Sequence, residues 1–153
     1  NFTVCRADDE DGARPLVRAD SSWFMFDANK GRPVRTPEAE SAPYLADARD
    51  DAPLDLPAIP RMIRVEDEGQ AAAPITVTGA HLDTNHHVNN AQFISLAGEC
   101  LPKNFTVHRM RAEYKQQAHL GDVLHPLRAE TENGCFISLN DEKGQPYVVV
   151  EFQ

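Results

Sequence analysis

The sequence predicts an α+β fold in which one antiparallel sheet wraps around a single apolar helix. Residues 74–153 contain one helical pattern early in a run of strand-like segments, in the order β-α-β-β-β-β. The chain has 153 residues, which suffices for one ordinary domain or two small halves. Its hydrophobic content of 41% supports a core and argues against global disorder.

The first 36 residues have the pattern of short β-structure. Residues 2–6 and 15–26 are strand-like, and the turn at residues 29–31 predicts a hairpin that continues through residues 32–35. The chain begins at Asn1 and enters a strand pattern at once, so we expect further residues upstream. The segment DEDGARPLV at residues 9–17 resembles DEKGQPYVV at residues 141–149, which predicts that residues 1–36 are the tail of a domain whose complete copy occupies residues 74–153.

The composition of residues 37–73 differs from that of the flanking segments and predicts a linker. Five of the eleven prolines fall in the first two thirds of this stretch, where acidic residues are frequent. Residues 38–48 are compatible with a short helix, since Pro37 suits a first helical turn. The rest is expected to lie over a surface.

Residues 74–153 predict the main domain. After a short strand at residues 75–78 and a polar loop, residues 91–101 are predicted to be helical, with Pro102 ending the helix and Asn89 or Asn90 capping it. The apolar residues at helical spacing are Phe93, Ile94, Ala97 and Leu101. Four strands are expected next, at residues 106–116, 122–130, 135–139 and 146–152.

Charge and cysteine content narrow the class of protein. The net charge of −9, with a pI near 5.0, argues against a nucleic-acid-binding surface. No apolar run reaches the length of a membrane span, and no secretory signal opens the chain. Cys5, Cys100 and Cys135 are odd in number and widely spaced, which indicates reduced thiols. We therefore expect a cytoplasmic protein with neither nucleic-acid nor membrane partners.

The most informative stretch is residues 81–90, which read HLDTNHHVNN. Asp83, Asn85 and His87 alternate, and alternate residues of an extended backbone project from the same side. A carboxylate, an amide and an imidazole on the same side of the backbone are the groups expected in an acid–base catalytic site. The alternative is a polar loop in which Asp and Asn only turn the chain and cap the helix.

A metal site is the other interpretation of three close histidines. Structural zinc sites take ligands from separate elements, commonly with Cys as a partner. His86 and His87 are adjacent and are expected to diverge, and His81 is expected to lie on the loop surface. We therefore favour acid–base chemistry and expect no metal.

Three segments resemble the acyl-acyl-carrier-protein thioesterases of bacteria and plants. They are DTNHHVNN at residues 83–90, RAEYKQQAHLGD at residues 111–122 and SSWFMFDANKGRPVR at residues 21–35, in the order of the family. The family fold is a tandem of two hotdog domains, each a sheet wrapped around a central helix. The resemblance implies that residues 74–153 are the second hotdog domain and that residues 1–36 are the last strands of the first.

The resemblance also implies a function. The expected reaction is hydrolysis of fatty acyl-acyl-carrier-protein by direct water attack, organised by Asp83, Asn85 and His87 without a metal or organic cofactor. The expected partner is acyl carrier protein bearing a phosphopantetheine-linked acyl chain, in a bacterial cytoplasm. An incomplete tandem would expose apolar sheet, so association as a homodimer is one option. The alternatives are an acyl-CoA thioesterase of the same fold and a non-catalytic acyl-binding module.

The chain departs from the family in the second segment. Many plant members carry a Glu followed by a Cys where this chain has Gln117 and Ala118. A cysteine nucleophile is therefore absent there, while the Gln117 amide remains able to position a water. Strict alternation places Gln117 on the charged face of its strand, so a bulge near Gln116 is required to bring it to the site.

Four further residues are candidates for the border of the site. Asn90 is expected to cap the helix and to border the site as well. Arg109, Arg111 and Lys115 form a basic stripe in an acidic protein, which suits docking of an acidic carrier protein. The alternative, which we favour, is a solvated strand face with Glu113 as its internal partner.

Overall fold

The computed structural model describes residues 2–9, 14–27, 29–46, 56, 62–64, 69–132 and 134–153. The chain divides into two units, Asn1–Ile59 and Pro60–Gln153, which are described separately. Cys100 and Cys135 are thiols that form no disulfide bond with a described residue. No helix in the described parts of the chain has the length and apolar character needed to cross a membrane.

The first unit consists of two short antiparallel strand pairs and a helix. Strand β1 (Phe2–Val4) pairs with β2 (Val17–Ala19), and β3 (Met25–Asp27) pairs with β4 (Arg32–Val34). The helix α1 (Glu38–Ala46) follows, as predicted. The predicted strand over residues 15–26 is wrong, because this stretch contributes to two separate pairs with an unpaired segment between them.

The β3–β4 hairpin is confirmed, and its turn has a clear cause. The Asp27 carboxylate accepts hydrogen bonds from the backbone N–H groups of Asn29 and Lys30, both at 3.0 Å. Gly31 then takes a φ of 59°, which suits glycine. No described residue of this unit is buried, and the Trp23 side chain is 81% exposed. The described part of the unit therefore contains no core.

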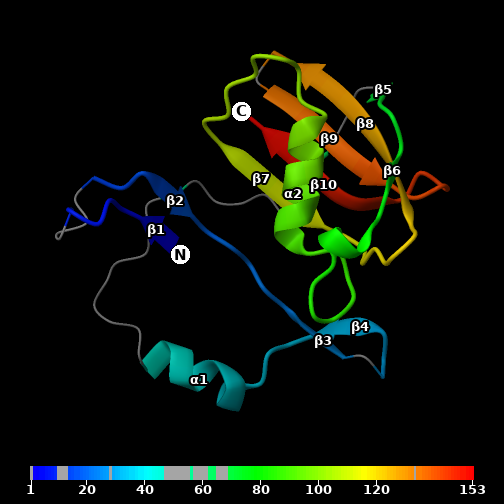
Figure 1. The fold of residues 1–153 in the computed structure, drawn as a ribbon. Helices are drawn as coiled ribbons and strands as arrows, with labels where there is room; N and C mark the ends of the chain where they lie inside the picture. The colour runs from blue at the N-terminus through cyan, green and yellow to red at the C-terminus, as the bar shows by residue number, and fades with distance from the viewer. Residues whose placement is uncertain are drawn as a thin grey trace. The chain divides into compact units, whose positions relative to one another are not determined.

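The second unit is a six-stranded antiparallel sheet with one helix packed against it (Figure 1). The order along the sheet is β5-β8-β9-β10-β7, and β6 also pairs with β8. The strands are β5 (Gln70–Ala71), β6 (Ile75–Thr76), β7 (Met110–Tyr114), β8 (Val123–Thr131), β9 (Gly134–Asn140) and β10 (Pro146–Phe152). The predicted order of elements is confirmed, with β5 added in a stretch that the sequence assigns to the linker.

The core lies between the sheet and helix α2 (Asn90–Glu99). The inward residues of the central strands are Cys135, Ile137, Leu139, Val148, Val150 and Phe152. They alternate along β9 and β10, because successive strand residues point to opposite faces. The helix contributes Phe93, Leu96 and Ala97 to the core. Phe93 and Ala97 belong to the predicted apolar set, and Leu96 does not.

Both ends of α2 are fixed by side chains. The Asn89 side chain accepts a hydrogen bond from the Ala91 N–H at 2.8 Å, which confirms the predicted cap. At the other end, the Arg128 guanidinium donates to the Cys100 carbonyl at 3.5 Å, where a positive charge favours the helix dipole. The start of α2, where the polar loop enters, is therefore held in a defined place.

Alanine substitutions at two glycines of this domain should change the free energy of unfolding in opposite directions. A Cβ at Gly134 would collide with the Phe152 carbonyl oxygen of the neighbouring strand, whereas a Cβ at Gly98 in α2 meets no atom. Gly134→Ala should therefore lower the free energy of unfolding by about 1–3 kcal/mol. Gly98→Ala should raise it by about 0.5–1 kcal/mol, through helix propensity. Urea unfolding followed by circular dichroism measures both, and equal effects of the two changes would contradict this packing.

Candidate active site

The polar loop is a tight hairpin that precedes α2. It begins after a short 3-10 helix (Gly79–His81) and is closed by an antiparallel bridge between Leu82 and Val88. The Asp83 N–H donates to the His87 carbonyl at 2.8 Å, and the Asn89 N–H donates to the His81 carbonyl at 2.9 Å. The backbone itself therefore sets the shape of the loop.

Asp83 holds the inside of this hairpin. Its Oδ1 accepts hydrogen bonds from the backbone N–H groups of Asn85 at 2.8 Å and His87 at 3.2 Å. The bond from the His87 N–H is the largest cause that lowers the pKa of Asp83 below its usual value, against an opposing contribution from partial desolvation. The carboxylate is therefore ionised at neutral pH and serves the turn.

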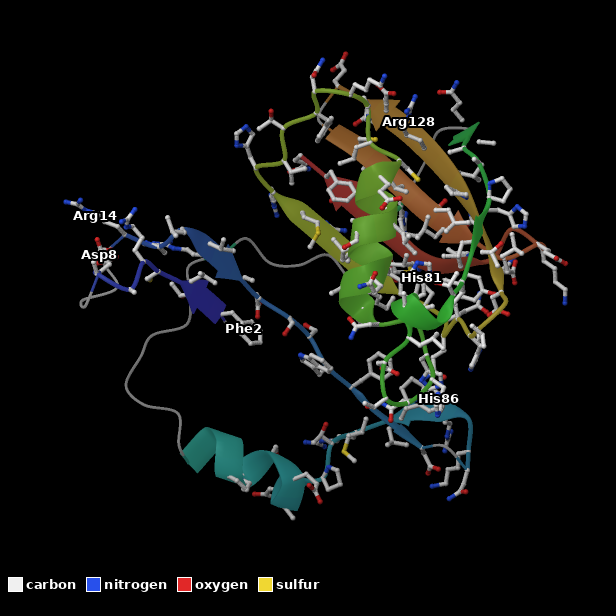
Figure 2. All side chains as sticks on the ribbon, viewed as in Figure 1. Phe2, Asp8, Arg14, His81, His86 and Arg128 are labelled. Atoms are coloured by element: carbon white, nitrogen blue, oxygen red, sulfur yellow. The ribbon has the colours of Figure 1, made fainter. Side chains whose placement is uncertain are left out.

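The expectation that Asp83, Asn85 and His87 alternate along extended backbone is wrong. The chain turns sharply between them, with the His86 N–H bonded to the Asp83 carbonyl at 3.1 Å and His86 at a φ of 61°. A non-glycine residue rarely adopts this left-handed conformation. Figure 2 shows His86 at the tip of the loop and His81 near its base. The turn interpretation therefore accounts for Asp83. His87 is partly buried and lies on the return strand of the loop, the segment that leads back from the tip to Val88.

Val88 joins the loop to the segment that follows β7. It is 4% exposed, and its N–H donates to the carbonyl of Ala118, which is 0% exposed, at 2.8 Å. This bond places His119 beside His87, with ring centroids 5.0 Å apart and ring planes at 85°. His119 is not among the site residues that the sequence predicts. Its only signal is its position two residues after Gln117, since the pairing that brings it to the loop is not visible in the sequence.

Asp122 organises the end of the same segment. Its Oδ2 accepts the His119 N–H at 2.8 Å and the Tyr147 hydroxyl at 3.4 Å, and lies 3.9 Å from His119 Nδ1. Burial raises the pKa of the Tyr147 hydroxyl, and the Asp122 carboxylate raises it further, so the hydroxyl remains a donor. The Tyr147 ring stacks on Phe93 of α2 at 6.4 Å, which connects this corner to the core.

The bulge required near Gln116 is present. The N–H groups of Lys115 and Gln116 both donate to the Tyr147 carbonyl, at 2.8 and 3.2 Å, and β7 ends at Tyr114. Two consecutive residues thus oppose one residue of β10, which is the pattern of a β-bulge. Gln117 is exposed beside Ala118, and its side chain forms no hydrogen bond with the described residues. Its role as a water-positioning group stays a prediction.

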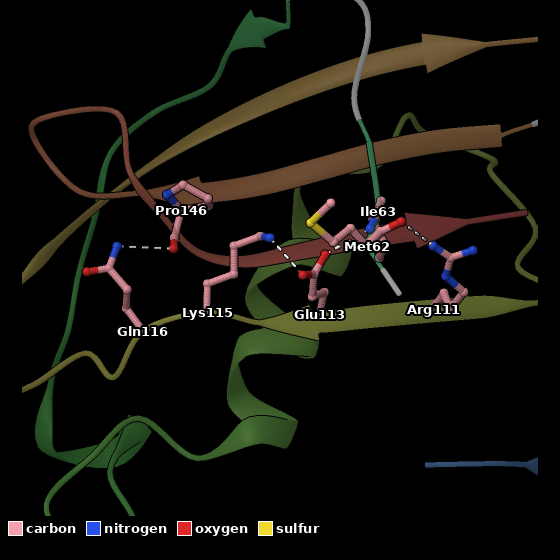
Figure 3. A network of polar contacts seen from close by, with 7 residues as sticks. All are labelled: Met62, Ile63, Arg111, Glu113, Lys115, Gln116 and Pro146. Atoms are coloured by element: carbon pink, nitrogen blue, oxygen red, sulfur yellow. Dashed lines mark hydrogen bonds and ion pairs between the residues drawn. The ribbon is translucent and has the colours of Figure 1, made fainter. Parts of the chain in front are cut away.

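The basic residues along and beside β7 are largely paired, and Figure 3 shows Lys115 joined to Glu113 and Arg111 joined to the Met62 carbonyl. Arg111 lies 3.5 Å from Glu151, and Lys115 lies 2.8 Å from Glu113, whose other oxygen accepts the Ile63 N–H at 2.8 Å. These side chains occupy the face of β7 opposite to Ala112, which packs against the core. The pairs favour the strand-face interpretation for Arg111 and Lys115. Arg109 is exposed, and docking through it stays a prediction.

The first turn of α2 presents backbone donors next to the loop. Asn89 accepts the N–H groups of Ala91 and Phe93, at 2.8 and 3.1 Å. Within the described chain, the N–H groups of Asn90 and Gln92 form no hydrogen bond. The Asn90 carbonyl accepts the Tyr114 hydroxyl at 3.2 Å, which fixes this turn against β7. A helix N-terminus with unpaired N–H groups favours a negative charge.

The sequence of this domain matches a known family. The family model described as the acyl-ACP thioesterase C-terminal domain matches residues 65–152, more than half of the chain. The chain belongs to the acyl-ACP thioesterase family. The predicted family and hotdog fold are thereby confirmed, with α2 as the central helix. No curated protein sequence matches the chain significantly.

Solved acyl-ACP thioesterase-like structures share the fold. One from Bacteroides thetaiotaomicron superimposes with a TM-score of 0.67 at 20% identity, over 83% of this chain and 51% of that chain. A putative oleoyl thioesterase from Lactobacillus plantarum gives 0.62 at 21% identity, over 86% and 53%. The 12:0-ACP thioesterase from Umbellularia californica gives 0.60 at 18% identity, over 84% and 52%. The chain thus spans about half the length of these proteins.

The turn role of Asp83 predicts a difference between two substitutions. Asp83→Ala removes the acceptor of two backbone hydrogen bonds, so it should lower the melting temperature and speed amide exchange at Asn85 and His87. Asp83→Asn keeps an oxygen acceptor and should retain most of both protections. Differential scanning fluorimetry and hydrogen exchange by NMR measure the two effects.

The lowered pKa of Asp83 gives this prediction a pH dependence. A depressed carboxyl pKa contributes stability that is present above the unfolded value and is lost as pH falls through the folded value. The difference in melting temperature between wild type and Asp83→Asn should therefore shrink as the solution is acidified below the usual aspartate pKa of 3.8. A difference that stays constant with pH would show that the charge of Asp83 does not stabilise the loop.

Proposed function

We propose that the protein hydrolyses the thioester of fatty acyl-acyl-carrier-protein and releases free fatty acid. The observation that carries this proposal is the His87 imidazole, presented by an anchored loop at the N-terminus of α2 in a domain of the acyl-ACP thioesterase family. The reaction needs a group that holds a water, a base that takes its proton and donors for the developing oxyanion. The loop and its surroundings offer candidates for each role.

The water would be held at the return strand of the loop. His87 is partly buried and its ring makes no hydrogen bond with the described residues, so its nitrogens are available to a water. Asn85 and Gln117 are exposed amides on the two segments that the Val88–Ala118 bond joins. Asp83 fixes the position of His87 by accepting its backbone N–H.

The oxyanion would face the first turn of α2. The Asn90 and Gln92 N–H groups are free in the described chain, and the helix dipole adds a partial positive charge there. Donors of this kind stabilise the tetrahedral oxyanion more than the planar carbonyl, so they lower the barrier rather than only binding substrate. Asn90 therefore borders the site through its backbone.

The proposed partner is acyl carrier protein with its phosphopantetheine-linked acyl chain. The names of the solved relatives from Umbellularia californica and Bacteroides thetaiotaomicron specify acyl-ACP substrates. Arg109 is the exposed cation of the β7 stripe and would meet an acidic carrier, while Arg111 and Lys115 contribute less because Glu151 and Glu113 pair with them. We further propose that the protein works in the bacterial cytoplasm.

The domain assignment is part of this proposal. Residues 74–153 would form the second hotdog domain, and residues 1–36 the last strands of a first one, with residues 37–73 as the linker. Trp23, Phe24 and Phe26 present apolar side chains that no described residue of the first unit buries, which suits a surface that packs against another element. A homodimer is one arrangement that would supply such an element.

A substrate panel tests the proposal directly. The purified protein should hydrolyse acyl-ACP at a higher kcat/KM than acyl-CoA of the same chain length, with free thiol measured by a chromogenic reagent. Comparable rates on the two substrates would contradict specificity for the carrier protein. Binding of acyl-ACP without turnover would instead identify a non-catalytic acyl-binding module.

His87→Ala should lower kcat by at least about 100-fold, because the variant loses the imidazole that aligns the attacking water. The fold should remain intact, because the His87 ring bonds to no described residue and the backbone bonds of the loop are retained. His108→Ala is the matched control, since His108 is exposed and contributes only its backbone to a hydrogen bond. Full activity in His87→Ala, with a native circular dichroism spectrum, would show that the site is elsewhere.

A further inference from the structure

Three properties occur together in His119 and in no other described histidine. Its side chain is 57% exposed, its ring contacts the ring of His87 at 5.0 Å, and a carboxylate lies within 4 Å of its ring nitrogen. The two rings are nearly perpendicular, so the edge of one meets the face of the other. A water bound at His87 would therefore have a second imidazole within its reach.

The carboxylate beside His119 belongs to Asp122. Its Oδ2 lies 3.9 Å from His119 Nδ1 and also accepts the His119 backbone N–H at 2.8 Å. A carboxylate at one ring nitrogen leaves the other nitrogen free to accept a proton and stabilises the imidazolium that forms. Contacts of this kind commonly tighten when substrate binds. Asp83, by contrast, uses Oδ1 on the backbone N–H groups of Asn85 and His87.

We propose, building on the hydrolysis inferred above, that His119 is the general base of this site and that Asp122 positions it. His87 then binds and aligns the attacking water. Because His119 takes the proton and His87 holds the water, the segment after β7 can carry Gln117, whose amide cannot accept a proton at neutral pH. The imidazole two residues further along, brought in by the Val88–Ala118 bond, supplies the proton acceptor.

The step balances without any further reactant. The water oxygen forms a bond to the thioester carbonyl carbon while one water proton moves to the free ring nitrogen of His119. The tetrahedral oxyanion then collapses, the C–S bond breaks, and the leaving thiolate takes the proton back from the imidazolium. The products are a carboxylic acid and a free thiol, and His119 returns neutral.

The charged surroundings suit this role. The groups that face His119 are His87 from the loop and Asp122 from its own segment. Tyr147 of β10 donates to Asp122, and Asp141 and Glu142 act on Tyr147 from the adjoining turn. The Asp83 carboxylate accepts the backbone N–H of His87.

The test compares His119→Gln with His87→Gln in the full-length protein, on the acyl thioester it hydrolyses fastest. An imidazole base gives the pH profile of kcat/KM an acid limb, because its protonated form cannot accept the water's proton. His119→Gln should abolish this limb and lower kcat by about 100-fold or more, with KM within about threefold of wild type. His87→Gln should lower kcat but keep the limb, because glutamine can still hold a water.

Two further variants separate the chemistry from the packing. Asp122→Asn keeps an oxygen for the His119 N–H and the Tyr147 hydroxyl but loses the charge, so kcat should fall by about tenfold while the melting temperature changes little. His108→Gln, an exposed histidine away from these contacts, should match wild type in rate and profile.

The outcomes distinguish this inference from the proposed function. An active wild type whose acid limb survives in His119→Gln, or disappears only in His87→Gln, overturns the base role of His119 and leaves thioester hydrolysis standing. A fall in kcat that follows a lower melting temperature, with the limb unchanged, shows a structural role and also overturns it. A wild type inactive on every acyl thioester refutes the proposed function and this inference together.

Discussion

The candidate site depends on one apolar residue within a polar motif. Val88 is buried in the core, and its N–H bonds to the carbonyl of Ala118, which is buried as well. A buried backbone donor must be paired, so this contact cannot loosen without a cost of about 1–3 kcal/mol. His87 precedes Val88, Asn89 follows it and caps α2, and His119 follows Ala118. A single anchored peptide therefore sets the positions of both imidazoles relative to the helix N-terminus.

The same polar residues serve structure and chemistry at once. Asp83 uses Oδ1 to accept two backbone hydrogen bonds within the hairpin, and this structural role alone explains an aspartate at this position. Because those bonds lower its pKa, the carboxylate also places a permanent negative charge beside the His87 backbone. Asn89 likewise satisfies two helix N–H groups and so leaves those of Asn90 and Gln92 as the free donors. The turn interpretation and the acid–base interpretation are thus compatible, because they use different atoms of the same loop.

Where local pattern determines structure, the sequence predicted it well. Apolar spacing predicted α2, Asn89 was one of its two predicted caps, and turn residues placed β8, β9 and β10 closely. The errors arose where structure depends on distant pairing. Residues 15–26 form two separate pairs rather than one strand, and the loop around Asp83 turns because its backbone bonds close a hairpin. His119 was missed for the same reason, since only the Val88–Ala118 pairing brings it to His87.

The bulge at Lys115 and Gln116 ends β7 and separates its paired, charged face from the candidate site. Before it, alternation places Tyr114 toward α2 and Glu113 on the outer face, where that carboxylate pairs with Lys115 and holds the Ile63 N–H. At the bulge, two N–H groups share the Tyr147 carbonyl and the regular ladder stops. The chain is then free to leave the sheet and carry Ala118 into the core. A straight continuation of β7 would keep these residues in register with β10, away from the loop. The bulge therefore allows two different surfaces to follow one another closely in the chain. The first is the charged face of β7, and the second is the segment that carries His119 to His87.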